Sequence, residues 1–469
     1  MVLAIGTTWI TLLSLLAHSH VQGSGIEQPQ ASKQQEVGAT TLQPGPSAQP
    51  APLISAQQRS IDLAEALAQA ESANFDARQA GVQSRIAAGE AVEARLGWIP
   101  SLTASSGIGR TDGQVQGSFG DFREVDFRSA APLARLSLEL NPVQTWFGVE
   151  AASRRSEGAA EFERAVRRLV LVRVAELYFE LVRERASVDV SRLAVEDARD
   201  LLRISEVLLR QGMGRGDDAE RARVELASTQ QRLLDAERRF HRASINLATA
   251  LNLDPQTTLV PATRGVDEVT LVRPDQDLEE ILRQAVATRP ELAAARRRLE
   301  EQRSERRAVI AGLASPTIEA FYQQGATGEN YGDLNQLTRY GVTASWTLSP
   351  SGLRRVETAA DRSAAATLAL DQAEQEIRAE ATAAFDDLRL FAAQVEHARQ
   401  ARAAAETALR ISQVRFRNGT SLAIEVLQAE QALEQARAAE VATIADYNQA
   451  QVRLRAQIGP VTPADLSGR

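Results

Sequence analysis

The segment TRYGVTASWTL, residues 338–348, alternates between apolar and polar side chains along its whole length. This period of two predicts a β-strand with one apolar face and one polar face. Segment 134–140 (ARLSLEL) alternates in the same way, and segments 99–109 (IPSLTASSGIG) and 316–325 (PTIEAFYQQG) are weaker versions of the pattern. A length of about ten residues suits a β-strand that crosses a membrane between lipid and a polar interior.

Aromatic residues accompany these predicted strands. Five of them lie in or beside the four segments, as is typical of side chains at a membrane–water interface: Trp98, Trp146, Tyr322, Tyr340 and Trp346. The alternative is a soluble sheet covered by helices, but four short strands leave two open edges. Because a membrane barrel needs at least about eight strands, closure requires several chains. Three chains would supply twelve strands.

The rest of the chain is a duplication. An offset of 207 residues aligns VEAASRRSE (149–157) with VETAADRSA (356–364), and seven of eleven residues in 202–212 are identical to those in 409–419. Upstream the offset drifts to about 215. Each half is predicted to contain a helix, two strands, a long helix, a glycine break and a final helix. The boundaries are repeat 1 at 59–254, a linker at 255–275, repeat 2 at 276–460 and a tail at 461–469.

Proline placement predicts where the long helices lie. No proline occurs between Pro142 and Pro255 or between Pro350 and Pro460, and a helix interior tolerates proline badly. We therefore predict two helical hairpins, with arms at 151–210 and 218–250 and at 353–417 and 422–458. Shorter helices at 60–96 and 276–312 are expected to stack end to end with the shorter arms. A coiled-coil scaffold without a channel is the alternative, and the strands argue against it.

Composition excludes several classes of function. A net charge of −8 argues against a nucleic-acid partner. The absence of cysteine excludes disulfides, thiol catalysis and cysteine-ligated metals. His241 and His397 each stand alone on a predicted helix, and the glycine-rich stretch 212–217 (GMGRGD) lacks the ending of a phosphate-binding loop. The sequence thus predicts a protein that is not an enzyme and holds no cofactor or metal.

The N-terminus has the features of an export signal. Residues 2–16 are apolar and precede small residues suited to cleavage, which predicts a signal peptide at 1–21. Residues 22–58 are rich in Gln, Pro and Ser and are predicted to be disordered. No later segment provides the roughly 20 consecutive apolar residues of a membrane-spanning helix.

With these features together, the chain resembles the TolC-like outer-membrane efflux proteins over roughly residues 58–460. The resemblance rests on the duplication, the strand entries WIPSL and LASPTI, the strand exits LELNP and TLSPSG, and the motif FRNGTSLAIEVLQA. It implies a mainly α-helical homotrimer whose twelve-strand β-barrel lies in the outer membrane of a Gram-negative-type cell. A long α-helical tunnel would continue into the periplasm. Segment 252–275 and the tail would form an equatorial region, and loops 109–131 and 325–337 would face outside.

The resemblance also assigns the two glycine breaks. They would be the tips of helical hairpins that meet a periplasmic adaptor protein, with contacts at Gly212, Gly419, Arg210, Arg417, Thr420, Leu422 and Ala423. The two glycines also fit ordinary helix ends, where a left-handed φ favours glycine. Both explanations hold at once.

A gate follows from the same resemblance. Six residues after each tip glycine, where the family tends to place an acid, stand Asp218 and Glu425. At the position where the family often carries a further acid, this chain has Gln428. At the position of the family's basic partner it has Ser421, and Arg215 of the first tip could substitute for that base. Repulsion among copies of Glu425 would act at the mouth. Acids that simply favour a helix start are the alternative.

The function implied is a passive exit duct of a tripartite efflux system. Its partners would be further copies of the chain, a periplasmic adaptor, an inner-membrane transporter of the RND or ABC type, and outer-membrane lipids. Two alternatives stay open: a duct for type I protein secretion and a non-channel periplasmic coiled-coil scaffold. The strands favour a duct over a scaffold, but nothing in the sequence separates small-molecule from protein cargo.

Overall fold

The computed structural model divides the chain into two units, Met1–Ser55 and Ala56–Arg469. The residues that it describes all belong to the second unit: 58–116, 119–212, 215–263, 265–418, 420–459, 462 and 464. The predicted signal peptide, nearly all of the predicted disordered segment, Gly419 and most of the C-terminal tail lie outside the described residues.

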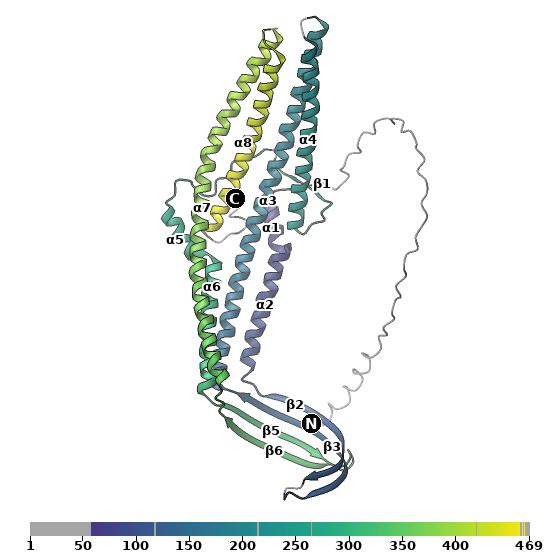
Figure 1. Ribbon diagram of the computed structural model, residues 1–469, viewed down its shortest axis with the longest axis vertical. Helices are drawn as coiled ribbons and strands as arrows, with labels where there is room; N and C mark the ends of the chain where they lie inside the picture. Colours follow the sequence, from purple (N-terminus) through teal and green to yellow (C-terminus); the bar gives the residue numbers. More distant parts are fainter. Residues whose placement is uncertain are drawn as a thin grey trace, which may run out of the picture. The chain divides into compact units, whose positions relative to one another are not determined.

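Two helical hairpins dominate this unit (Figure 1). The first joins α3 (Pro142–Arg210) to α4 (Gly216–Ala250), and the second joins α7 (Pro350–Arg417) to α8 (Ala423–Gln457). At 1.5 Å per residue, α3 is about 100 Å long. Both long helices start earlier than predicted, because each has proline in its first turn, where the missing N–H is no loss.

The shorter helices correct the prediction of two unbroken segments. Residues 60–96 form α1 (Leu63–Ala73) and α2 (Phe75–Leu96), and residues 276–312 form α5 (Leu278–Thr288) and α6 (Pro290–Ala314). Asn74 and Arg289 occupy the breaks in extended conformations. Asn74 caps α2 with its side chain, whereas the second break precedes Pro290, which disfavours a helical conformation at the residue before it.

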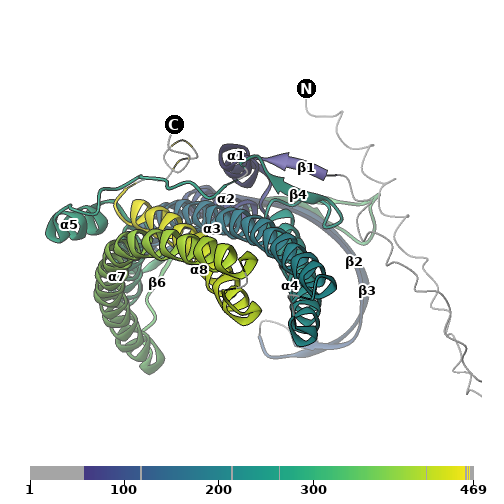
Figure 2. The ribbon, with the colours of Figure 1, turned by 90° about the horizontal axis from the view of Figure 1, so that it is seen from above.

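Helices α2 and α4 run beside α3 (Figure 1), and the helices form one curved layer when seen from above (Figure 2). Helices α1, α2, α4 and α6 all pack against α3, and α5, α6 and α8 pack against α7. The side-chain amide of Asn74 donates to the carbonyl of Ala250 at 2.9 Å. This bond places the end of α4 beside the α1–α2 break, so that α2 and α4 succeed one another along α3 as their lengths suggested.

A four-stranded antiparallel sheet follows the order β2-β3-β5-β6. Its strands are β2 (Ser101–Gln116), β3 (Phe122–Leu140), β5 (Thr317–Thr327) and β6 (Asn335–Ser345). The prediction of a loop at 109–131 was wrong, since most of that range extends the β2–β3 hairpin. The ends of the predicted loop 325–337 also belong to strands. In contrast, β6 stops at Ser345, so Trp346 and Leu348 lie beyond the strand.

A second, small sheet was not predicted. Strand β1 (Gln58–Ile61) pairs in parallel with β4 (Thr258–Pro261), and β4 lies in the segment expected to be equatorial. Each strand has only four residues, which is too short for an alternating pattern to be recognised.

Among the described residues, three apolar cores hold the helices together. One surrounds the middle of α3 and includes Leu181 and Leu247, and another surrounds the middle of α7 and includes Leu388 and Leu454. The third joins both hairpins near their tips and includes Leu201 of the first hairpin with Leu409, Phe416 and Val426 of the second. Among the described residues, no helix is long and apolar enough to cross a membrane.

These cores give a first prediction. Leu388 is 0% exposed, whereas Leu390 on the same helix is 61% exposed. We expect Leu388→Ala to destabilise the helical region by about 2–5 kcal/mol, because it leaves a cavity in a packed core. Leu390→Ala is the matched control and should change the free energy of unfolding by less than about 1 kcal/mol in the isolated chain. Thermal unfolding followed by circular dichroism measures both, and a Leu388→Ala variant as stable as the wild type would contradict the packing described here.

Candidate functional site

One face of the sheet carries an apolar row that crosses all four strands. Leu102 pairs with Leu136, Leu136 with Tyr322, and Tyr322 with Tyr340. Directly paired residues point to the same face of a sheet. Leu102 is 74% exposed and Tyr340 is 78% exposed. A soluble sheet would bury such a row, so this face calls for an apolar environment outside the chain.

The apolar face has the height of a membrane. On β3 it comprises every second residue, namely Leu140, Leu138, Leu136, Ala134, Pro132 and Ala130. Ten residue steps of about 3.4 Å along a strand tilted by about 40° give a band about 26 Å tall, close to that of outer-membrane barrels. Beyond Ala130 the same face turns polar, where Arg110 and Asp126 form an ion pair at 2.9 Å.

The opposite face of the sheet is polar. Arg135 lies over the ring of Phe321, with its guanidinium carbon 4.9 Å from the ring centroid. Its Nη2 donates to Oε1 of Glu319 at 2.7 Å. A sheet that is apolar on one side and charged on the other has the alternation of a lipid-facing and lumen-facing barrel wall.

The five predicted interfacial aromatics occupy two levels. Trp98 follows α2, Trp146 lies in α3 near its start and Trp346 follows β6, so all three stand where helices meet the sheet (Figure 1). The indole N–H of Trp346 donates to the carbonyl of Leu313 at 2.8 Å. Tyr322 and Tyr340 pair within the strands instead and belong to the apolar row.

The far end of the helices holds the two hairpin tips (Figure 1). In the first, Gly212 has φ +74°, a left-handed conformation that glycine adopts at little cost. Its N–H donates to the carbonyl of Leu209 at 3.0 Å. Gly212 therefore ends α3 as the sequence suggested.

The second tip is closed by hydrogen bonds to the end of α7. The backbone N–H and the side-chain hydroxyl of Thr420 both donate to the carbonyl of Arg415 at 2.9 Å. The hydroxyl of Ser421 donates to Oε2 of Glu425 at 2.8 Å. These bonds fix the chain as it turns into α8.

The predicted adaptor-contact residues are not equally accessible. Arg210, Arg417, Thr420 and Leu422 are exposed at the tips. Ala423 is 0% exposed and belongs to the core that joins the hairpins. Ala423 thus supports the tip from inside and presents no surface of its own in the isolated chain.

The predicted gate residues are also placed differently from one another. Glu425 and Gln428 are exposed, whereas Asp218 is buried at the start of α4. Arg215 pairs with Asp217, its Nε lying 3.3 Å from Oδ1, rather than with either predicted gate acid. Within the described ranges, no hydrogen bond or ion pair joins Asp218 to Glu425.

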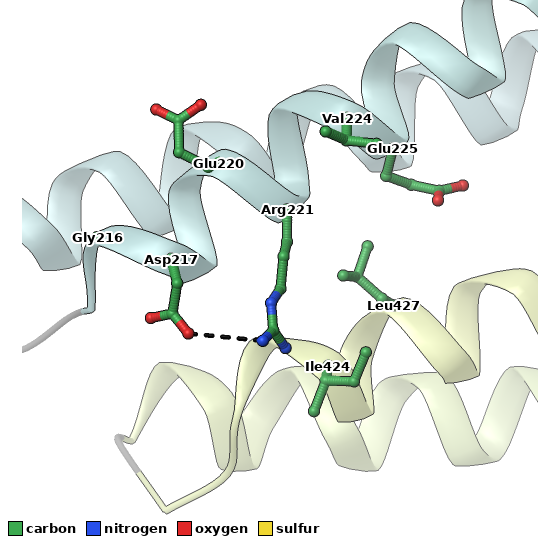
Figure 3. Close-up of a pocket in the computed structure, with 8 residues that line it drawn as sticks. All are labelled: Gly216, Asp217, Glu220, Arg221, Val224, Glu225, Ile424 and Leu427. Carbon is green, nitrogen blue, oxygen red and sulfur yellow. Dashed lines mark ion pairs between the residues drawn. The ribbon is translucent and has the colours of Figure 1, made fainter.

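A groove between α4 and α8 lies beside the tips (Figure 3). Its volume is about 650 Å³, and it is lined by Gly216, Asp217, Glu220, Arg221, Val224, Glu225, Ile424 and Leu427. Arg221 extends across the groove towards the start of α8 while pairing with Asp217 at 3.6 Å. This groove could not be recognised from the sequence, because its two walls come from different repeats.

A half-buried acid further along α8 was also missed. Glu430 lies among α3, α4 and α8, beside a small cavity of about 10 Å³ that Asp197 and Glu225 also line. Burial, reinforced by the charges of Asp197, Glu225 and Asp200, raises the pKa of Glu430 to about 8. Neighbouring acids are partly neutralised: Glu434 accepts two hydrogen bonds from Arg232, at 3.0 and 2.9 Å.

Metal-binding clusters are not found in the part of the chain that the structure describes. A family model described as outer membrane efflux protein matches residues 66–253 and 281–460, which correspond to the two repeats.

The chain belongs to the outer membrane efflux protein family. This confirms the TolC-like resemblance. The family consists of outer-membrane channels rather than enzymes.

Solved structures of outer-membrane channels and of an outer membrane protein share the fold. The outer-membrane channel OprN is 21% identical with a TM-score of 0.76, over 85% of this chain and 90% of OprN. The Campylobacter jejuni CmeC outer membrane channel is 15% identical with a TM-score of 0.77, over 85% of each chain. The outer membrane protein VceC from Vibrio cholerae is 18% identical with a TM-score of 0.73, over 85% of this chain and 96% of VceC. A comparison with curated proteins finds no match.

Proposed function

We propose that three copies of this outer membrane efflux protein close a twelve-strand barrel in the outer membrane and continue as a helical duct through the periplasm. The observation that carries the proposal is the sheet, with its apolar row, its polar opposite face and its two unpaired edges, β2 and β6. In lipid every backbone hydrogen bond must be satisfied, so an open four-strand sheet needs strands from neighbouring copies.

The hairpin tips would receive a periplasmic adaptor, which links the duct to an inner-membrane transporter of the RND or ABC type. Small molecules would then pass outwards without work by this chain. The supporting features are the exposed side chains of both tips and the groove between α4 and α8, which offers Val224 and Ile424 between charged residues. A surface with an apolar floor and a charged rim suits a protein partner.

Substitution of Glu425 tests whether the hairpin tips form the gate at the periplasmic mouth of the duct. Its side chain is exposed beside the tip, so symmetry-related copies would repel one another and attract cations. We expect the purified wild-type protein to give small channels in planar bilayers and Glu425→Gln to change their conductance at least about twofold. Asp218→Asn should have a weaker effect, because Asp218 is buried within its own chain.

The matched control is Asp200→Asn, an exposed acid of α3 that pairs with Arg203 away from the tip. Its channels should resemble the wild type. If the wild type forms channels and neither tip variant changes their conductance, the gate assignment is wrong but the duct stands. A pure, folded protein that forms no channel would overturn the proposed function.

A further inference from the structure

The register of the sheet places two arginines in one row on the polar face. Thr103 pairs with Arg135, Arg135 with Gln323, and Gln323 with Arg339. Arg135 and Arg339 are two strand spacings apart, or about 10 Å. This row lies next to the apolar row on the opposite face, well inside the band that would cross the membrane.

The two arginines differ in how well they are paired. Arg135 makes its ion pair with Glu319, yet its Nε is buried without a hydrogen-bond partner. Arg339 is exposed, and among the described residues it has no ion pair, hydrogen bond or aromatic contact. The row therefore carries one uncompensated positive charge and one unsatisfied buried donor in each chain.

The acids of the same face lie at another level. Glu139 pairs with Glu319, and Glu319 pairs with Thr343, four residues along the strands from the arginine row. Four residues span about 13 Å. Glu319 is already engaged by Arg135, which leaves Arg339 without a compensating acid in its own row. Positive charge is thus concentrated on the side of the sheet farther from the helices.

We propose that Arg135 and Arg339 form an anion-binding belt on the inner wall of the barrel, which takes carboxylate or phosphate groups of passing solutes. The proposal rests on the proposed function, because the polar face lines a lumen only if three chains close a barrel. Closure would repeat the row three times, with three copies of Arg135 at one level and three of Arg339 at a second level about 6 Å away along the axis of a barrel whose strands are tilted by about 40°. Rings of arginine in a pore select for anions, and the guanidinium fork matches carboxylate and phosphate oxygens.

Single-channel recordings in a potassium chloride gradient test the belt. We expect Arg339→Gln to lower the anion-to-cation permeability ratio on the order of threefold. Inorganic phosphate should reduce the wild-type current, and this block should weaken in Arg339→Gln. Arg339→Lys should keep the permeability ratio but bind phosphate less well, since lysine lacks the planar fork.

Arg354→Gln is the control, because Arg354 is an exposed arginine of α7 outside the sheet. It should leave both the permeability ratio and the phosphate block unchanged. The belt alone would be overturned if the wild type forms channels but Arg339→Gln and Arg339→Glu have the same permeability ratio and the same phosphate block as the wild type. A wild-type protein that forms no channel would contradict the proposed function itself, so the two failures are distinguishable.

Discussion

Arg289→Ala is expected to destabilise the helical region by about 3 kcal/mol, because it removes one partner from a buried ion cluster. Arg289 occupies the break between α5 and α6 and is 6% exposed. Its Nε donates to Glu291 at 3.1 Å and its Nη2 to Glu380 at 2.9 Å. It also donates to Gln457 at the end of α8. One side chain therefore connects α6, α7 and α8.

A second buried arginine belongs to the same cluster. Arg168 of α3 pairs with Glu291 and donates to the carbonyl of Ala456 at 3.1 Å. Burial, followed by the charge of Arg289, lowers the pKa of Arg168. Without Arg289 the cluster keeps two carboxylates and one guanidinium, and Gln457 loses its donor.

The control for Arg289 is Arg283→Ala in the preceding helix. Arg283 is exposed and pairs with Glu280 one turn away, so its loss should change the free energy of unfolding by about 0.5 kcal/mol or less. Thermal and denaturant unfolding of the helices, followed by circular dichroism, gives both values. If Arg289→Ala had the same unfolding midpoint as the wild type, the cluster would have no role in stability.

The residue at the corresponding break in repeat 1 is uncharged. Asn74 stands 215 positions before Arg289 and reaches the end of α4 through a single hydrogen bond to Ala250. Both repeats thus tie the break in the shorter helices to the end of the hairpin. Only repeat 2 does so with a charged side chain, since Arg289 donates to Gln457 at the end of α8.

Glu430→Gln is expected to stabilise the protein at neutral and alkaline pH. The pKa of Glu430 is raised from 4.5 to about 8 by burial and by neighbouring acids, so the folded chain holds a proton that the unfolded chain releases. The destabilisation that Glu430 causes is absent below pH about 4.5, grows as the pH rises towards 8 and is constant above pH 8. At pH 7 it amounts to roughly 3 kcal/mol, since each pH unit in this window contributes about 1.4 kcal/mol.

Glutamine resembles the protonated form of Glu430, so the variant should match the wild type near pH 4.5 and exceed its stability increasingly up to pH 8. Glu434→Gln is the matched control with the opposite sign, because Glu434 is paired with Arg232 and its neutralisation removes an ion pair. Unfolding midpoints measured from pH 4.5 to 9 make the comparison. A difference between wild type and Glu430→Gln that did not vary with pH would contradict the buried acid.

The elements that could be predicted from the sequence are those with a long regular pattern. The hairpins followed from stretches without proline that are interrupted by glycine, and the inner parts of the strands followed from alternation. The outer half of the β2–β3 hairpin was missed because the alternation fails there: beyond Ile108 the apolar face continues with Arg110 and Asp112. The break at Asn74 was missed because an asparagine alone is a weak signal for a helix end.

The candidate site was predictable only in part. The tip glycine at 212 and its neighbours could be located from the repeat, because a left-handed residue and a helix start leave local signatures. Burial of Asp218, Ala423 and Glu430 depends on helices from the other repeat or the other arm, which no local pattern records. The arginine row likewise depends on register, which couples β3 to β6 through β5.

The most direct test of the trimeric barrel is a cysteine cross-link between its two sheet edges. The chain has no cysteine of its own, so Thr103→Cys on β2 can be combined in turn with Gly341→Cys, Thr343→Cys or Ser345→Cys on β6. Within one chain these strands are three spacings apart, about 14 Å, whereas a disulfide needs Cα atoms within about 7 Å. Any disulfide between the two positions must therefore join different chains.

Membranes that contain each double variant would be oxidised and the covalent species separated under denaturing conditions, with Thr103→Cys alone as the control. The account predicts that at least one β6 position gives a covalent product of three chains and nothing larger, since the third bond closes the ring. A ladder that continues beyond three chains would indicate an open sheet that polymerises. Monomers at every position would show that β2 and β6 do not meet, and would contradict the barrel.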